Sequence, residues 1–194
     1  MRSQGLRGFE SHPHRHAAPM RVIAGEFRSR RLKTLPGWHV RPTPDRLREA
    51  LFNVLAPRIE GCTFLDAYAG TGAVGIEALS RGAARAIFVE KHAPALRILR
   101  ENLRVLGLES RAQVVRGEAS RALGRLRADI VFLDPPYREQ DEYRRALQAL
   151  ARATIALVVV QHPTKLSLEE TYGPLRRTRT LRQGDNVVSF FELG

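Results

Sequence analysis

The chain has very little cysteine and no long apolar run, and each absence excludes a class of protein. Its single cysteine, Cys62, excludes an internal disulfide and any zinc site made of several cysteines, which fits a reducing cytosol. No apolar stretch approaches the roughly 18 residues of a membrane-spanning helix. At 194 residues the sequence predicts one ordinary globular domain in the cytoplasm, most simply a monomer.

Lysine and acidic residues are also scarce beside arginine. Lysine occurs only at Lys33, Lys91 and Lys165, so arginine supplies nearly all of the 32 basic residues, against 20 acidic ones. The net charge of +12 and the pI of about 11.1 predict a polyanionic partner, most simply nucleic acid. Arginine binds phosphate bidentately and stacks on bases, although a GC-rich genome also raises arginine content. The net charge is therefore stronger evidence for a nucleic-acid partner than the preference for arginine over lysine.

The N-terminal region divides into two parts. Residues 1–19 show no hydrophobic periodicity and no apolar core of a signal peptide, and we expect them to form a disordered tail. Met20–Gly25 and Arg30–Leu35 are predicted to be two short strands of a β-hairpin. Residues 20–40 would then form a basic arm, followed by the main domain at 41–194.

The basic arm has two interpretations. Charged residues on an exposed hairpin can simply discourage aggregation at its edges. The same charges can bind the phosphates of a nucleic acid, and the overall charge favours this second interpretation. The residues predicted to contact RNA are Arg21, Arg28, Arg30, Arg31 and Lys33 of the arm, and Arg46 of the following helix.

The main domain is predicted to be a doubly wound, mainly parallel α/β sheet. Thr43 and Pro44 favour the start of a helix over 44–56. From Thr63 onwards, short apolar runs alternate with helical periodicity, which is typical of such a sheet. The predicted strands are Thr63–Asp66, Ala86–Glu90, Ala112–Arg116, Asp129–Asp134 and Ile155–Gln161. One predicted helix follows a glycine loop and ends at Arg81. Three more are predicted over 93–106, 119–126 and 140–152. Leu175–Leu181 and Val187–Leu193 predict a C-terminal antiparallel hairpin.

The segment Asp134-Pro135-Pro136-Tyr137 follows a predicted buried strand. Neither proline can donate to a sheet ladder, so the strand ends there. In an open α/β sheet this end is where ligands bind. The Asp134 carboxylate and the Pro135 carbonyl, expected to be free, could each accept one hydrogen of a planar amine, while Tyr137 stacks on its ring. The alternative is a turn that merely ends a strand.

The glycine loop Gly70–Gly75 matches the pattern GxGxxG after a strand, which alone is a weak signal. Glu90 ends the next strand, where a carboxylate can accept both ribose hydroxyls of either NAD or S-adenosylmethionine. Asp66 would repel a pyrophosphate and suits the ammonium group of an amino-acid cofactor, unless it only caps the loop. Glu118 is placed to reach an adenine amine or to cap a helix.

These motifs resemble those of a known family. Asp66-Ala-Tyr-Ala-Gly-Thr-Gly72, with Asp134–Tyr137, resembles the S-adenosylmethionine-dependent amino-methyltransferases. Arg21–Gly25, Arg41–Asn53 and Gly184–Glu192 resemble the RsmD-type 16S ribosomal RNA guanine-N2 methyltransferases, from about residue 20 to the C-terminus. The resemblance implies a Rossmann-like class I fold, S-adenosylmethionine as cofactor, and methylation of one guanine in the P-site hairpin loop of 16S rRNA. The partner would be this rRNA in the small subunit or its assembly intermediate.

The resemblance also implies residue roles. The catalytic motif is Asp134, Pro135, Pro136 and Tyr137, and the predicted cofactor-binding residues are Arg41, Pro42, Thr43, Asp66, Tyr68, Gly70, Thr71, Gly72, Glu90, Glu118, Ala119 and Asp134. Tyr68 stands where phenylalanine is commoner, Glu118 where aspartate is usual, and Gln161-His162 at a commonly acidic position. We expect no metal site.

Three other functions compete with this one. A DNA adenine-N6 methyltransferase would use a similar amine-holding motif, but the arm, the Arg41–Asn53 segment and the lack of a DNA target-recognition domain argue against it. A nucleic-acid-binding module that has lost activity is disfavoured by the intact motifs. A nicotinamide oxidoreductase leaves Asp134–Tyr137 unexplained.

Overall fold

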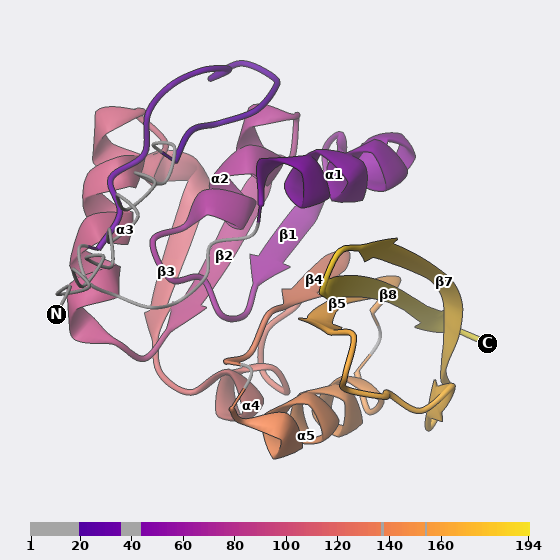
Figure 1. The fold of residues 1–194 in the computed structure, drawn as a ribbon. Helices are drawn as coiled ribbons and strands as arrows, with labels where there is room; N and C mark the ends of the chain where they lie inside the picture. Colours follow the sequence, from indigo (N-terminus) through magenta and orange to yellow (C-terminus); the bar gives the residue numbers. More distant parts are fainter. Residues whose placement is uncertain (1–19, 36–43, 137, 154) are drawn as a thin grey trace, which may run out of the picture.

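The structure is a computed structural model that describes residues 20–35, 44–136, 138–153 and 155–194. They form an eight-stranded sheet with helices on both faces (Figure 1), in the strand order β3-β2-β1-β4-β5-β8-β7-β6. The strands are β1 Thr63–Asp66, β2 Arg85–Glu90, β3 Ala112–Arg116, β4 Ile130–Leu133, β5 Leu157–Pro163, β6 Thr171–Tyr172, β7 Leu175–Gln183 and β8 Asn186–Leu193. The helices are α1 Asp45–Ile59, α2 Ala73–Ser80, α3 Ala93–Val105, η1 (a 3-10 helix) Glu109–Arg111, α4 Ala119–Ala122 and α5 Gln140–Leu150.

The parallel part of the sheet confirms the predicted Rossmann-like fold. Strands β3, β2, β1, β4 and β5 run parallel to one another. All four residues of β4 are buried, as expected for a strand covered on both faces. The strand order reverses between β1 and β4, and in open α/β sheets the ligand crevice lies at the carboxyl ends of the strands at such a point.

The other end of the sheet is antiparallel, with β8 between β5 and β7. The predicted C-terminal hairpin is confirmed and is longer than expected, with a register shift between Arg177 and Arg179. Elements as short as β6 and η1 carry no periodicity, so they were not predicted. The helix predicted over 119–126 was wrong in length: α4 ends at Ala122, shortly before the helix-breaking Gly124.

Two apolar layers hold the helices to the sheet. Helix α1 packs with Leu51 and Phe52 on the face of β1, β4 and β5, and α2 and α3 extend this layer over β2. Helices α4 and α5 cover the opposite face, where Tyr143 and Leu147 of α5 are buried (Figure 1). Among the described helices, none combines the length and the apolar character needed to cross a membrane.

The predicted N-terminal hairpin is only partly formed. Arg21 and Arg31 make an isolated antiparallel bridge, and neither predicted strand is present in the described arm. The N–H groups of Ile23 and Ala24, which a longer hairpin could use, instead donate to the Glu77 carboxylate at 2.7 and 3.1 Å. The arm therefore pairs with α2, because a buried carboxylate competes for its backbone donors.

Gly25 marks the closest approach of the arm to α2. Its φ is +82°, and a Cβ placed there would lie 1.8 Å from the backbone oxygen of Ser80. We expect Gly25→Ala to lower the free energy of unfolding by about 1–3 kcal/mol more than Gly61→Ala does, because overpacking adds to the conformational strain. Gly61 is the matched control, since its φ is +72° and a Cβ there meets nothing within 4 Å. Equal losses in urea denaturation would contradict this packing.

Candidate active site at the carboxyl edge of the sheet

Three acidic residues meet where β1, β2 and β4 end. Asp66 is the last residue of β1, Glu90 is the last of β2, and Asp134 directly follows β4. The three strands are neighbours in the sheet, and adjacent strands lie about 4.8 Å apart. The strand order therefore brings together, at one edge of the sheet, three carboxylates that the sequence analysis considered separately.

Asp66 is the most deeply buried of the three. Only 2% of the residue is exposed, and its Oδ2 accepts the N–H of Gly75 at 3.0 Å, in the first turn of α2. Burial raises the pKa of Asp66 to about 7, against the opposing effect of this hydrogen bond. The carboxylate does anchor the glycine loop, as the alternative interpretation held. Because burial raises its pKa, a nearby cation would stabilise its ionised form.

The glycine loop is held against the end of β2. Gly70 donates its N–H to Glu90 Oε2 at 2.8 Å, and His92 donates to Oε1 at 2.8 Å. Gly72 adopts a φ of +90° as the N-cap of α2, which favours glycine. Each Glu90 oxygen still has a lone pair to offer, so the carboxylate can receive two hydroxyl donors without losing the loop.

Asp134 is half-buried at the same sheet edge as Asp66 and Glu90. Burial, together with the negative charge of Asp66, raises the pKa of Asp134 to about 8. Gln161 of β5 donates its side-chain N–H to Asp134 Oδ2 at 3.3 Å, a role that the sequence did not reveal. Two adjacent acids with raised pKa values form a site that a positively charged ligand would stabilise.

The turn after Asp134 differs from expectation in one respect. The Pro135 carbonyl is not free, because Tyr143 donates its buried hydroxyl to it at 3.0 Å. Helix α5 begins at Gln140, so Tyr143 lies one turn inside it, beneath the prolines. A carbonyl has two lone pairs, so Pro135 keeps one for a ligand. Tyr137 lies outside the described residues.

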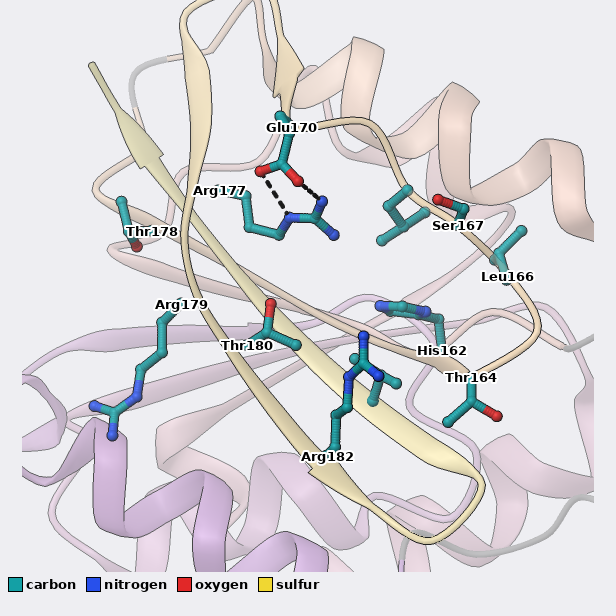
Figure 2. Close-up of a pocket in the computed structure, with 12 residues that line it drawn as sticks. His162, Thr164, Leu166, Ser167, Glu170, Arg177, Thr178, Arg179, Thr180 and Arg182 are labelled. Atoms are coloured by element: carbon teal, nitrogen blue, oxygen red, sulfur yellow. Dashed lines mark hydrogen bonds and ion pairs between the residues drawn. The ribbon is translucent and has the colours of Figure 1, made fainter.

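His162, next to Gln161, belongs to a separate cavity near the C-terminal hairpin (Figure 2). Only 3% of the residue is exposed, and a hydrogen bond of 3.0 Å joins its Nε2 to Ser189 Oγ. Burial lowers the pKa of His162, which keeps the ring neutral at pH 7. Gln161 and His162, whose roles the sequence left open, thus contact different sites.

The remaining predicted cofactor-binding residues each make a different kind of contact. Tyr68 directs its hydroxyl to Glu142 Oε1 at 2.9 Å, and the Thr71 carbonyl accepts the side-chain N–H of Asn102 at 2.9 Å. Glu118 is exposed and makes no side-chain cap for α4; its carboxylate pairs with Arg121 at 3.1 Å, and Ala119 is buried. Arg41, Pro42 and Thr43 lie outside the described residues.

The predicted RNA-contacting residues fall into two groups. Arg21 and Lys33 pair with Asp45 and Glu101. The others are exposed and make no ion pair with any described residue; they are Arg28, Arg30, Arg31 and Arg46. The free positive charge of the described arm therefore lies at its turn and second half, with Arg46 on α1.

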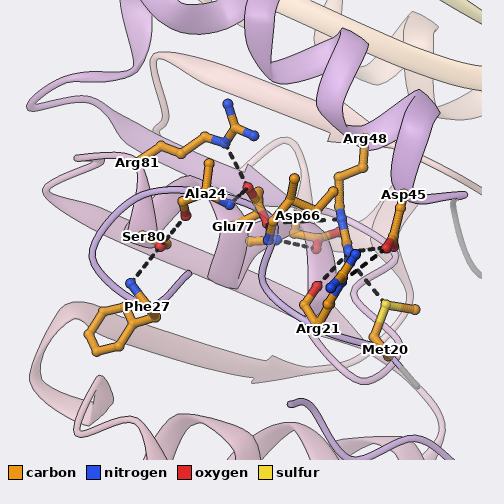
Figure 3. Close-up of polar contacts among 12 residues, drawn as sticks. Met20, Arg21, Ala24, Phe27, Asp45, Arg48, Asp66, Glu77, Ser80 and Arg81 are labelled. Atoms are coloured by element: carbon orange, nitrogen blue, oxygen red, sulfur yellow. Dashed lines mark hydrogen bonds and ion pairs between the residues drawn. The ribbon is translucent and has the colours of Figure 1, made fainter. Parts of the chain in front are cut away.

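A buried ion network that the sequence did not reveal fixes the arm to α1 and α2 (Figure 3). The side chains of Arg48 and Glu77 are fully buried, with Arg48 Nε 4.0 Å from Glu77 Oε2. Arg48 also donates to the Arg21 carbonyl at 2.6 Å, and Arg81 donates to Glu77 at 2.6 Å. Because α2 begins at the glycine loop, this network connects the arm to the helix that follows that loop.

Asn102 of α3 makes a second connection of this kind. Its amide accepts the N–H of Lys33 at 2.8 Å and donates to the Lys33 carbonyl at 3.0 Å, while also donating to Thr71. One side chain thus joins the end of the arm to the glycine loop. Within the described ranges, no cluster of three or more acidic, histidine or cysteine residues is arranged to hold a metal ion.

The raised pKa values of the two acids predict a pH dependence of stability. Because Asp66 and Asp134 hold their protons to about pH 7 and 8, the folded protein binds more protons than the unfolded chain above pH 4. Their contribution to the free energy of unfolding therefore falls as pH rises from 4 to 8. His162 acts in the opposite sense, since its pKa is lowered.

The variant Asp134→Asn isolates this effect. We expect its free energy of unfolding, relative to the wild type and without cofactor, to increase steadily between pH 5 and pH 8 in urea titrations, because the amide cannot ionise. A difference that stays constant, or one that reverses, would show that the carboxyl titrates normally in the folded protein.

Comparison with known proteins places this edge in context. Residues 20–192 match the model of a protein family described as "Conserved hypothetical protein 95". The chain is 37% identical to the "Putative rRNA methyltransferase YlbH" of Bacillus subtilis, over 89% of this chain and 98% of that protein. It is 42% identical to the "Ribosomal RNA small subunit methyltransferase D" of Escherichia coli, over 64% of each. The solved structure titled "Putative methyltransferase yhhF from Escherichia coli" has a TM-score of 0.80 at 33% identity, covering 90% of this chain and 98% of that one.

Proposed function

The chain belongs to the conserved hypothetical protein 95 family, to which the RsmD methyltransferases belong, and from this premise we propose that it methylates the exocyclic N2 of one guanine in 16S rRNA. Its fold is that of a class I methyltransferase. The relatives named above supply the choice of rRNA and of the small subunit. The choice of guanine N2 and of the P-site hairpin loop comes from the motif resemblance alone.

The observation that carries the proposal is the position of Asp134. The carboxylate follows the strand next to β1, at the edge where Asp66 anchors the glycine loop. A substrate amine held by Asp134 and a cofactor held by the loop would therefore meet across neighbouring strands. The site supports transfer between two bound molecules.

The residues at this edge fit S-adenosylmethionine. That molecule carries a positive sulfonium and an ammonium group, which would stabilise the ionised forms of Asp66 and Asp134. Glu90 keeps the lone pairs needed to accept ribose hydroxyls. A pyrophosphate would face repulsion from the same acids, which disfavours a nicotinamide cofactor. When bound, S-adenosylmethionine supplies an electrophilic methyl group.

The protein then acts by orienting the amine. The Asp134 carboxylate and the remaining lone pair of the Pro135 carbonyl each accept one hydrogen of the guanine N2, so the nitrogen lone pair faces the methyl group. Tyr137 would stack on the guanine ring. Asp134 need not remove a proton first, since the amine loses one readily to solvent once it is alkylated.

The basic arm completes the proposal. Residues 20–40 would contact rRNA through Arg28, Arg30 and Arg31, which are exposed and make no ion pair with the described residues. The main domain at 41–194 would bind the cofactor, with Arg41, Pro42 and Thr43 over its pocket. We propose that the protein works as a monomer in the cytoplasm, on the small subunit or its assembly intermediate.

A methylation assay tests the proposal against its rivals. The purified protein is incubated with labelled S-adenosylmethionine and either undermethylated small subunits or duplex DNA, and the products are analysed as nucleosides. We expect label in N2-methylguanosine from the subunits alone. Label in N6-methyladenine of the DNA would instead identify a DNA methyltransferase, and failure to bind S-adenosylmethionine would identify a binding module without activity.

A further inference from the structure

A polar cavity of about 680 Å³ lies at the antiparallel end of the sheet (Figure 2). Strand β7 forms one wall, and the segment 164–170 after β5 forms the other, with His162 and Val187 between them. The side chains at its walls are mainly hydroxyls and guanidinium groups; they include Thr164, Ser167, Arg177, Thr180 and Arg182. The composition suits an anion.

The charges of this cavity are only partly neutralised. Arg177 makes two hydrogen bonds to the Glu170 carboxylate, which fixes its position and cancels its charge (Figure 2). Arg182 is exposed and makes no ion pair with any described residue. His162 stays neutral because burial and the two neighbouring arginines lower its pKa. Arg182 is therefore a cation that still lacks a counter-charge within the described structure.

The cavity lies near the carboxyl end of β5, the edge of the sheet at which Asp134 lies, and on the face covered by α4 and α5. Val187 of β8 pairs with both Arg182 and His162, so these three residues lie in register across β7, β8 and β5. The preceding residue of β5, Gln161, points to the opposite face of the sheet and contacts Asp134. The backbones at Arg182 and Asp134 are thus about three strand spacings apart, roughly 15 Å, and an RNA chain would pass around the sheet edge between them. A polymer that places a base at Asp134 can reach Arg182 within a few nucleotides.

A second basic hollow, lined by Arg121, Arg125, Arg127 and Arg152, is placed differently. Helices α4 and α5 start at the catalytic edge, after β3 and β4, and run back along the sheet. Arg125 and Arg152 follow the carboxyl ends of these helices and precede the starts of β4 and β5, so this end of the hollow lies towards the opposite edge. It therefore matches the first cavity in charge but not in position.

We propose that the cavity at His162, Thr164 and Arg182 binds the phosphodiester backbone of the RNA substrate beside the target base. Arg182 supplies the charge and Thr164 and Thr180 supply hydroxyl donors, while the Glu170–Arg177 pair shapes the wall. This inference rests on the proposed function, because it assumes that the substrate is RNA. It adds a second contact surface, separate from the arm.

The test compares charge reversal at the two basic sites. Arg182→Glu should raise KM for undermethylated small subunits by about 10-fold at 150 mM salt, with little change in kcat, because a charge-assisted phosphate contact becomes repulsive. It should also weaken binding of protein-free 16S rRNA. Arg125→Glu is the matched control, since it makes the same charge change on an exposed arginine at the far edge, and it should change KM less than 2-fold.

Arg182→Ala serves as a milder variant if the reversed charge prevents folding, and S-adenosylmethionine affinity verifies the fold of each protein. It should raise KM in the same direction and lower the salt dependence of rRNA binding by about 0.7 in the slope of log K against log salt. Equal effects of the Arg182 and Arg125 variants would overturn the proposal. So would an effect on subunits without one on protein-free rRNA, which would indicate a ribosomal protein. If the wild type itself fails to methylate rRNA, the proposed function has failed instead.

Discussion

Asp134→Ala should lower kcat for methyl transfer by about 1000-fold while leaving S-adenosylmethionine affinity within a few-fold of the wild type. The carboxylate accepts one of the two amine hydrogens, so its loss removes an interaction that orients the nitrogen lone pair during transfer. The glycine loop does not depend on Asp134, because Asp66 and Glu90 hold it through Gly75 and Gly70. Single-turnover kinetics and calorimetric titration of the cofactor measure the two quantities separately.

The conservative variant Asp134→Asn sharpens this test. An amide can still accept one hydrogen through its oxygen, so we expect it to retain more activity than alanine, at about 10–100-fold below the wild type. Gln161→Leu removes a side-chain donor to Asp134 and should cost less than 10-fold, because that bond is long at 3.3 Å. Full activity of Asp134→Ala would contradict the mechanism.

Arg48→Met should lower the free energy of unfolding by about 3–5 kcal/mol. Methionine retains much of the apolar stem, but it leaves the buried Glu77 carboxylate without one of its two cationic neighbours. It also leaves the Arg21 carbonyl without its donor, since Arg48 bonds to it at 2.6 Å. Urea denaturation measures the loss directly.

Arg144→Met is the matched control for this prediction. Arg144 pairs with Asp141 at 3.4 Å on the surface of α5, where 59% of the arginine side chain is exposed. Exposed pairs contribute about 0–1 kcal/mol, so this variant should remain within 1 kcal/mol of the wild type. If the two substitutions had equal effects, the network in Figure 3 would not hold the arm as described.

The fold could be predicted because most of its signals are local. The apolar run before Asp134 and the leucine spacing of 93–106 each indicate one element, and the alternation of such elements implies a parallel sheet. The carboxyl edge then follows from topology alone, which is why Asp66, Glu90 and Asp134 could each be assigned to the end of a strand from the sequence. The resemblance added the family, which the family match confirms, and the detailed chemistry stays a proposal.

Apart from the shortest elements and the length of α4, the features that sequence did not reveal depend on tertiary contacts. Glu77 captures the backbone donors of Ile23 and Ala24, which shortens the predicted hairpin to one bridge. Tyr143 reaches the Pro135 carbonyl, and Gln161 reaches Asp134, through side chains whose partners no periodicity can indicate. The roles of Arg41–Thr43 and of Tyr137, outside the described residues, stay predictions.

The most direct test of the proposed function is mass spectrometry of 16S rRNA from matched strains with and without the gene. The account predicts that one N2-methylguanosine, within the P-site hairpin loop, disappears when the gene is deleted and returns with the wild-type protein but not with Asp134→Ala. An rRNA whose modifications are unchanged by the deletion, or the loss of a different modified base, would contradict it.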